Sequence, residues 1–162
     1  MQTVVLPGYS PKNEIWAQAV VDNLKVDGSA TLHKWAHWSD GEFDIKNEVS
    51  RIQKEIVDQK INIIAKSVGT QVFMSLLPLV KATLHKVILC GIPIDPVTYL
   101  QGLRSFNSSN LLIIQNSQDP FMPYGPVAVY LKLVNKDIPV IQKTSSTHDY
   151  PYYDDFNKFL SS

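Results

Sequence analysis

The chain has 162 residues, which predicts one domain over residues 1–162 that is large enough to bury a sizeable core. Hydrophobic residues make up 44% of it and charged residues 19%, a composition that excludes a disordered or fibrous chain. The 15 Lys and Arg balance the 15 Asp and Glu, so we expect a small-molecule substrate and no nucleic-acid partner.

Six short apolar runs, most of them rich in β-branched residues, are spread along the chain. They are residues 3–6, 29–32, 61–65, 86–89, 111–114 and 138–141. The runs are continuous rather than alternating, a pattern typical of strands buried on both faces of a parallel sheet. We therefore expect six parallel strands.

Helical patterns fill most of the gaps between these runs. They cover residues 14–24, 43–57, 68–80, 127–133 and 152–160. Pro78 should kink or end the third helix, because proline removes a backbone donor. Gly, Pro, Asn and Asp in 91–110 and 115–125 indicate loops. Strands that alternate with helices predict a doubly wound α/β domain with right-handed crossovers.

The third run leads directly into a serine flanked by small residues, in the sequence Ala65-Lys66-Ser67-Val68-Gly69. A helical pattern follows at once, so Ser67 lies at a strand-to-helix turn. A nucleophile elbow needs small residues two positions before and after its serine, because the turn is sharp and strained. Ser67 is therefore a candidate nucleophile, although a serine here could also simply cap the helix.

Two further candidates follow Ser67 along the chain. Asp119 comes after the fifth run and His148 after the sixth. With this order of Ser, Asp and His, nearly the whole chain resembles the α/β-hydrolase superfamily. Within it, the chain is similar to the small lidless YdeN-like and retinoblastoma-binding-protein-9-like serine hydrolases. The resemblance implies a catalytic triad of Ser67, Asp119 and His148, with Asp95 as the alternative acid.

The same resemblance implies an oxyanion hole made of the backbone N–H groups of Tyr9 and Val68. Tyr9 follows Pro7 and Gly8 at the end of the first run, where the family has a His-Gly-x sequence. Pro7 replaces the histidine, which leaves the anchoring of this loop open. Ala65 replaces the first glycine of the usual elbow, a mild change because alanine is small.

The resemblance also implies an architecture. We expect a three-layer α/β/α sandwich around a six-stranded parallel sheet of order 2-1-3-4-5-6, a minimal α/β-hydrolase fold without a cap domain. Ligands of such sheets bind at the carboxyl ends of the strands, where the strand order reverses. The loop at Gly8 and the turn at Ser67 both fall at that point.

An aromatic segment, residues 35–41, follows the second run. His37 and Trp38 could wall a substrate pocket with Gly8 on one side and with Phe121 and Met122 on the other. Alternatively, these aromatic side chains pack a loop onto the sheet. His33 lies nearby, but neither Cys nor a carboxylate accompanies it at a zinc-like spacing, so we expect no metal and no other cofactor.

The remaining features indicate a soluble cytoplasmic protein. The single cysteine, Cys90, lies in an apolar run and is expected to be a buried structural thiol. The first residues lack the basic and apolar regions of a signal peptide, and no apolar run is long enough to span a membrane.

The sequence thus predicts hydrolysis of a small ester, thioester or amide through an acyl-enzyme, most simply by a carboxylesterase. A catalytically inactive binding or interaction protein with the same fold is the alternative. A flavodoxin-like or nucleotide-binding domain has less support, because no Gly-rich phosphate loop follows the first run. The acyl group and the oligomeric state stay open.

Overall fold

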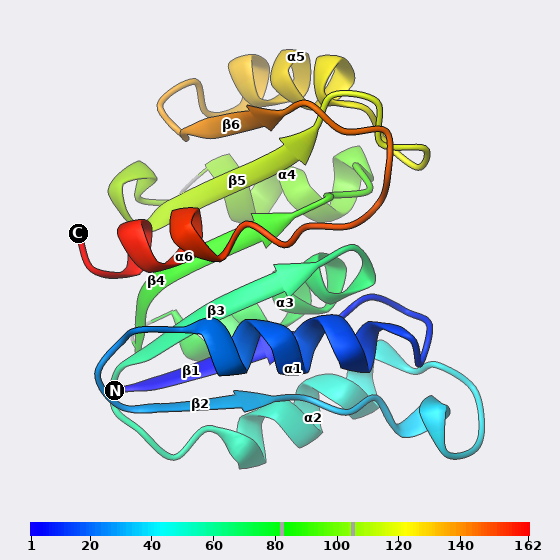
Figure 1. Cartoon of the computed structure of the whole chain (residues 1–162), viewed down its shortest axis with the longest axis vertical. Coiled ribbons are helices and arrows are strands. Elements are labelled where there is room, and N and C mark those ends of the chain that lie inside the picture. Colours follow the sequence, from blue (N-terminus) through cyan, green and yellow to red (C-terminus); the bar gives the residue numbers. More distant parts are fainter. Residues whose placement is uncertain (82, 105) are drawn as a thin grey trace.

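A computed structural model describes residues 1–81, 83–104 and 106–162. Its centre is a six-stranded, all-parallel sheet of order β2-β1-β3-β4-β5-β6 (Figure 1), which confirms the predicted topology. The strands are β1 (Gln2–Leu6), β2 (Ser29–Leu32), β3 (Ile61–Lys66), β4 (Leu84–Cys90), β5 (Leu111–Asn116) and β6 (Val140–Lys143).

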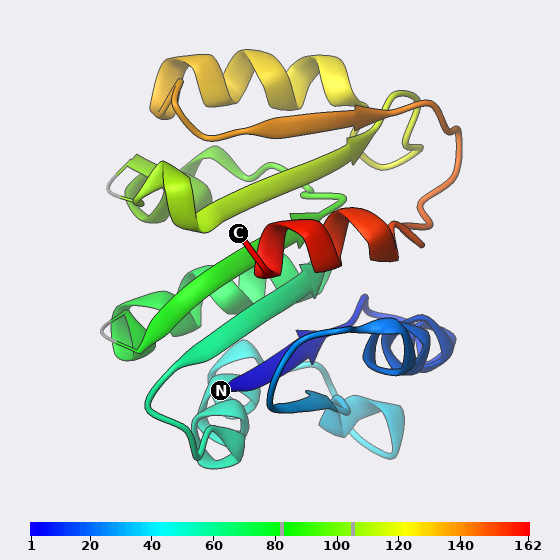
Figure 2. The same cartoon turned by 60° about the vertical axis from the view of Figure 1, so that its left-hand side comes forward.

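Helices cover both faces of the sheet and complete the three layers (Figures 1 and 2). The α-helices are α1 (Asn13–Asn23), α2 (Ile45–Glu55), α3 (Val68–Val80), α4 (Pro96–Arg104), α5 (Tyr124–Val134) and α6 (Tyr153–Leu160). Helices α1 and α6 lie on one face, and α2 to α5 lie on the other. Two short 3-10 helices, η1 (Ala36–Trp38) and η2 (Ser108–Asn110), lie in loops.

The sheet separates two hydrophobic cores because its central strands are buried on both faces. Ile63 of β3 packs toward α2 and α3, and its neighbour Ile64 packs toward α1 and α6. Cys90 is fully buried in the second core, as expected. The register pairs Leu6 with Ala65 and Lys66 with Cys90, so the carboxyl ends of β1, β3 and β4 meet at one edge.

The structure corrects two expectations about the elements, while helix α3 spans the predicted residues 68–80 and ends two residues past the exposed Pro78. Residues 96–104, expected to be a loop, form α4, which buries Tyr99 and Leu103 one helical turn apart. Strand β6 begins at Val140 rather than at residue 138, directly after a proline that cannot donate to the ladder.

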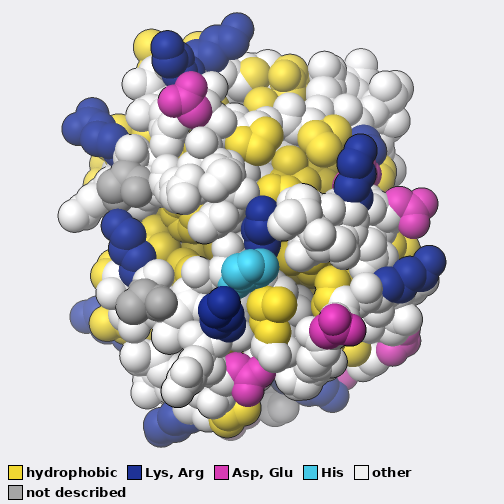
Figure 3. All heavy atoms as spheres, turned by 90° about the vertical axis from the view of Figure 1, so that its left-hand side faces the viewer, with side chains coloured by type: hydrophobic (Ala, Val, Ile, Leu, Met, Phe, Trp, Pro, Cys, Tyr) yellow, Lys and Arg dark blue, Asp and Glu magenta, His cyan; other side chains and the backbone are white. Residues whose placement is uncertain are grey.

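The amino ends of the strands lie on the side of the sheet opposite to the carboxyl ends of β1, β3 and β4. Figure 3 views that face, where Lys and Arg side chains are scattered among apolar and uncharged groups. In the described ranges of the chain, no helix is both long and apolar enough to cross a membrane.

Candidate active site

Ser67 occupies a strained turn between β3 and α3. Its φ of 54° makes it the one non-glycine residue with positive φ among those described. Such a conformation costs about 1–3 kcal/mol and persists only where the surroundings enforce it. The Ser67 N–H donates to the Cys90 carbonyl at 2.9 Å, and the Ser67 carbonyl accepts from the Thr70 hydroxyl at 2.6 Å. The turn is therefore fixed from both sides.

Gly69 occupies a position in the turn after Ser67 that needs a residue without a side chain. A Cβ at this position would lie 2.4 Å from the Leu6 carbonyl oxygen and 2.7 Å from that of Pro7. Both obstacles are backbone atoms at the end of β1, which cannot rotate away. The first turn of α3 thus packs directly against the loop that carries Gly8 and Tyr9. Ala65 is fully buried, so its methyl group fits where the family has glycine.

Asp119 and His148, 29 residues apart in sequence, form a short hydrogen bond between Oδ2 and Nδ1 at 2.6 Å. Tyr150 donates its hydroxyl to the same oxygen at 2.5 Å. The other oxygen, Oδ1, accepts the backbone N–H groups of Phe121 at 2.9 Å and Met122 at 3.3 Å. The carboxylate is therefore held by four donors and keeps its orientation toward the imidazole.

These contacts also set the charge of Asp119. Burial alone would raise the pKa of its carboxyl group, but the hydrogen bonds from Tyr150 and His148 outweigh it and hold the pKa below its usual value. A carboxylate that stays ionised at neutral pH can fix the tautomer of the neighbouring imidazole and stabilise the imidazolium.

Asp95, the alternative acid, has other partners. Its carboxylate accepts the Val97 N–H at 3.1 Å and the Thr98 hydroxyl at 2.5 Å, at the start of α4. The bond from Thr98 is the main reason why the pKa of Asp95 is lowered. The geometry therefore pairs His148 with Asp119 and assigns Asp95 to the first turn of a helix.

His148 keeps its second ring nitrogen free. Nε2 is buried and has no hydrogen-bond partner among the described residues. The ring atom next to it, Cε1, would lie 2.9 Å from a Cβ added to Gly91. Gly91 directly follows Cys90, whose carbonyl accepts the Ser67 N–H. The imidazole and Ser67 are therefore close, but no hydrogen bond joins them in this part of the structure. Such bonds are often long before substrate binds.

The aromatic segment lies against the loop of Gly8 and Tyr9. Trp35 donates its indole N–H to the Gly8 carbonyl at 3.0 Å. His37 Nε2 and the Trp38 indole N–H both lie within hydrogen-bond distance of the Tyr9 carbonyl, at 2.9 and 2.8 Å. The Tyr9 ring also stacks on His37 with centroids 4.5 Å apart. The loop is therefore anchored by side chains although Pro7 replaces the family's histidine.

Both proposed oxyanion donors remain available. Within the described part of the chain, the backbone N–H groups of Tyr9 and Val68 donate to no protein acceptor. They come from the two segments that meet at Gly69. Val68 also begins α3, so the positive end of the helix dipole adds to its N–H.

A cluster of His33, Glu48, Arg51 and Glu55 contacts the aromatic segment. His33 is fully buried, with Nε2 2.8 Å from Glu48 and Nδ1 2.7 Å from Glu55. Arg51 contacts the same Glu48 oxygen at 2.6 Å, and the other oxygen accepts the Ala36 N–H at 2.8 Å. His33 therefore serves the fold. Among the residues described, no group of three or more His, Cys, Asp and Glu side chains could hold a metal ion.

The pocket residues expected from the sequence divide into two groups. Phe121 is 71% exposed and places its ring edge-on to His148, with centroids 4.6 Å apart, while Met122 packs against the core. His37 and Trp38 lie on Tyr9 and pack the loop onto the fold, which was the alternative interpretation.

A depression beside His148 has a different lining. It is lined by α1 and the loop after β6, with Trp16, Lys66 and Tyr153 among its residues. Burial lowers the pKa of Lys66, which donates to Asn13 at 2.9 Å and lies over the Trp16 ring. These residues were not predicted, because the approach of α1 to the loop after β6 is a long-range contact.

Asn116, another residue not predicted, clamps the loop that carries His148. Its side-chain amide donates to the carbonyls of Thr147 and Asp149, both at 2.9 Å, and its oxygen accepts the Tyr152 hydroxyl at 2.6 Å. The two carbonyls flank His148 in sequence. The end of β5 thus fixes the backbone on both sides of the imidazole.

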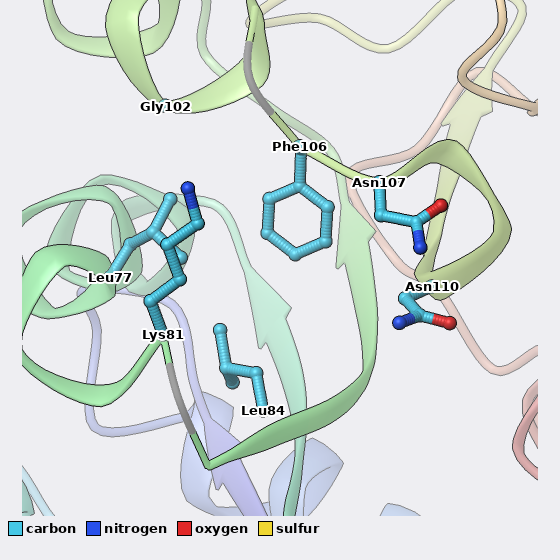
Figure 4. Close-up of a pocket in the computed structure, with 7 residues that line it drawn as sticks. All are labelled: Leu77, Lys81, Leu84, Gly102, Phe106, Asn107 and Asn110. Carbon is cyan, nitrogen blue, oxygen red and sulfur yellow. The ribbon is translucent and has the colours of Figure 1, made fainter.

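A further cavity lies at the other end of the sheet (Figure 4). It has a volume of about 100 Å³ and lies between α3, α4 and the start of β4. The side chains of Leu77, Leu84 and Phe106 surround it, and Lys81 lies at its side. The described residues that line it are apolar side chains, Lys81, Gly102 and two asparagines, with no His and no carboxylate among them.

Comparisons with solved structures agree with this fold. Est1E from Butyrivibrio proteoclasticus, in its structure with ferulic acid bound, matches with a TM-score of 0.72 over 99% of this chain and 88% of its own, at 14% identity. The ydeN gene product of B. subtilis matches with a TM-score of 0.67 over 99% of each chain, at 16% identity. A Xanthomonas campestris α/β serine hydrolase without a lid matches with a TM-score of 0.66 over 99% of this chain and 78% of its own, at 12% identity.

No family model and no curated protein matches the sequence. The structural likeness at such low identity defines the architecture: the chain has the α/β-hydrolase fold, as the resemblance implied.

Proposed function

We propose that this chain is a serine hydrolase that cleaves a small ester, thioester or amide through an acyl-enzyme. The observation that carries the proposal is His148, whose Nδ1 is bound to Asp119 and whose Nε2 is left without a partner close to the strained turn of Ser67. General-base activation of a serine requires an imidazole that is oriented by a carboxylate in this way and keeps its other nitrogen free for the hydroxyl.

In the proposed mechanism, Ser67 Oγ attacks the carbonyl carbon of the substrate and His148 Nε2 takes the hydroxyl proton. The electron pair of the carbonyl moves to its oxygen, which the N–H groups of Tyr9 and Val68 stabilise. The intermediate collapses, the leaving group departs with the proton from His148, and an acyl-Ser67 ester remains. His148 then takes a proton from water as the water attacks this ester, and it passes this proton to Ser67 Oγ as the ester bond breaks, which releases the acid and free Ser67.

The substrate class follows from the open site. Phe121 is the exposed side chain beside the imidazole, and no lid covers it in the described chain. An open site cannot enclose a long acyl chain, so we infer a carboxylesterase that prefers small acyl groups. The ferulic acid bound to Est1E shows that a protein of this fold accommodates a compact aromatic acid.

An inactive binding protein is the second candidate, and one observation favours it. In the described chain, the hydroxyl of Ser67 makes no hydrogen bond to His148. If the two groups never come together, the fold would bind an acyl compound without cleaving it.

Labelling with a fluorophosphonate separates the two candidates. We expect the probe to label the wild type but not Ser67→Ala. The control is Ser75→Ala, which replaces an exposed serine on α3, the helix that follows Ser67, and should still be labelled. We also expect turnover of p-nitrophenyl acetate and butyrate by the two labelled proteins only. Labelling that survives Ser67→Ala would refute the assignment of the nucleophile. A wild type that is neither labelled nor active would favour the binding protein.

A further inference from the structure

The peptide unit between Gly8 and Tyr9 has one fixed end. Its carbonyl oxygen, on Gly8, accepts the indole N–H of Trp35 at 3.0 Å. Its N–H, on Tyr9, is the proposed oxyanion donor. The described chain contains no cis peptide bond, so this carbonyl and this N–H point in opposite directions from one rigid plane. Whatever holds the carbonyl therefore aims the N–H.

Trp35 is itself held firmly. It is 1% exposed, and its ring packs edge-on against His33 and Phe43, with centroids 4.7 and 5.5 Å apart. The next residue, Ala36, donates its N–H to the buried Glu48 at 2.8 Å. The indole therefore presents its N–H from a position that cannot readjust without disturbing the core.

The following peptide unit, between Tyr9 and Ser10, provides an internal contrast. Trp38 donates its indole N–H to the Tyr9 carbonyl at 2.8 Å, and His37 reaches the same oxygen at 2.9 Å. This unit carries the N–H of Ser10, which has no part in the proposed oxyanion hole. Two tryptophans on one short segment thus hold two consecutive peptide units, and one of these units supplies the donor.

We propose that Trp35 is a positioning residue that aims the Tyr9 N–H at the oxyanion. This inference rests on the proposed hydrolase activity and extends it. The indole N–H anchors the loop, which therefore does not need the histidine that the family has at the position of Pro7. Loss of one oxyanion donor lowers kcat by about 10²–10³-fold, and a donor that is present but misdirected should cost about 10–10²-fold. Because the donor acts on charge that develops in the transition state, KM should change little.

The test compares an ester with its thionoester, in which sulfur replaces the carbonyl oxygen. Sulfur accepts hydrogen bonds poorly, so an enzyme with a working oxyanion hole prefers the oxygen substrate strongly. We expect Trp35→Phe to lower kcat for the ester about 10–10²-fold, while the thionoester is affected much less. The ratio of the two rates should therefore fall. Trp38→Phe removes the same indole donor from the neighbouring unit and should leave the ratio at its wild-type value.

Equal losses on both substrates in Trp35→Phe, or no loss at all, would overturn the proposal. Trp35 is buried, so this variant could fold poorly. In that event, 3-benzothienylalanine incorporated at position 35 replaces only the N–H by sulfur and keeps the shape of the ring, and the same fall in the ratio is expected. Failure of the proposed function is separately visible, because the wild type would then show neither turnover nor labelling of Ser67.

Discussion

Replacing Gly69 by alanine tests the close packing of the first turn of α3 against the end of β1. The added Cβ would lie 2.4 Å from the Leu6 carbonyl oxygen, whereas real Cβ atoms stay at least 3.0 Å away, so the two segments must separate by at least about 0.6 Å. Overpacking of this kind costs about 1–3 kcal/mol, and rigid backbone on both sides puts it at the upper end. A helical glycine replaced by alanine gains about 1 kcal/mol, which leaves a net loss of about 2 kcal/mol.

Urea unfolding followed by tryptophan fluorescence measures this loss. The matched control is Gly125→Ala, because Gly125 is the second residue of α5, as Gly69 is of α3, and nothing lies within 4 Å of its added Cβ. We expect the stability of the control to lie within about 1 kcal/mol of the wild type, because the helical gain of alanine is opposed by its contact with the ring of Pro126.

The same displacement should reach the site. Gly69 touches the end of β1, where the loop with Tyr9 begins, so the oxyanion donors on Tyr9 and Val68 would move apart. A misplacement approaching 1 Å can cost up to about 10²-fold in rate, and we expect kcat on a small ester to fall by about 10-fold or more. A Gly69→Ala protein with wild-type stability and wild-type kcat would show that the first turn of α3 does not pack on β1 in this way.

Two more predictions concern His148 and its supports. Asn116→Ala should lose about 2–3 kcal/mol, because it strips buried groups of their partners, and should also lower kcat by releasing the loop of His148. Its control, Asn135→Ala, removes a similar clamp on two carbonyls remote from the site and should lose stability without losing activity. Asp119→Asn should lower kcat by about 10⁴-fold in esterase assays. Because the folded pKa of Asp119 lies below its usual 3.8, its ionised form stabilises the fold above that pH, and this contribution is lost as the pH falls through the folded value. Acid titration of the unfolding free energy should therefore be steeper for the wild type than for Asp119→Asn; equal slopes would contradict the assignment of this carboxylate.

Most of the fold could be predicted from the sequence because its signals are local. Continuous β-branched runs mark strands buried on both faces, and their alternation with helical patterns leaves few topologies. Helix α4 was missed because Pro93, Pro96 and Gly102 read as loop punctuation. A proline at the first position of a helix is compatible with it, and the spacing of Tyr99 and Leu103 was the available signal for a buried face.

The residues of the candidate site also divide into those with a local sequence signal and those without one. Ser67 became a candidate from its immediate neighbours, and the family resemblance offered Asp119 and His148 as its partners because they follow the last two strands. Trp35 and Asn116 were not recognised because each acts on a carbonyl that is distant in sequence, 27 residues away for Trp35 and 31 and 33 residues away for Asn116. A side chain that orients a remote backbone group leaves no periodic or motif-like trace.

Cys90 places a chemical reporter beside the turn at Ser67. It is the one cysteine in the sequence, it is fully buried, and burial raises the pKa of its thiol. A disulfide reagent can therefore reach it only when the fold opens around it, either by displacement of the helices α1 and α6 that cover it or at β4, next to the carbonyl that holds the Ser67 N–H. The rate of thiol modification in native buffer thus measures how often the fold opens beside Ser67, without an engineered label.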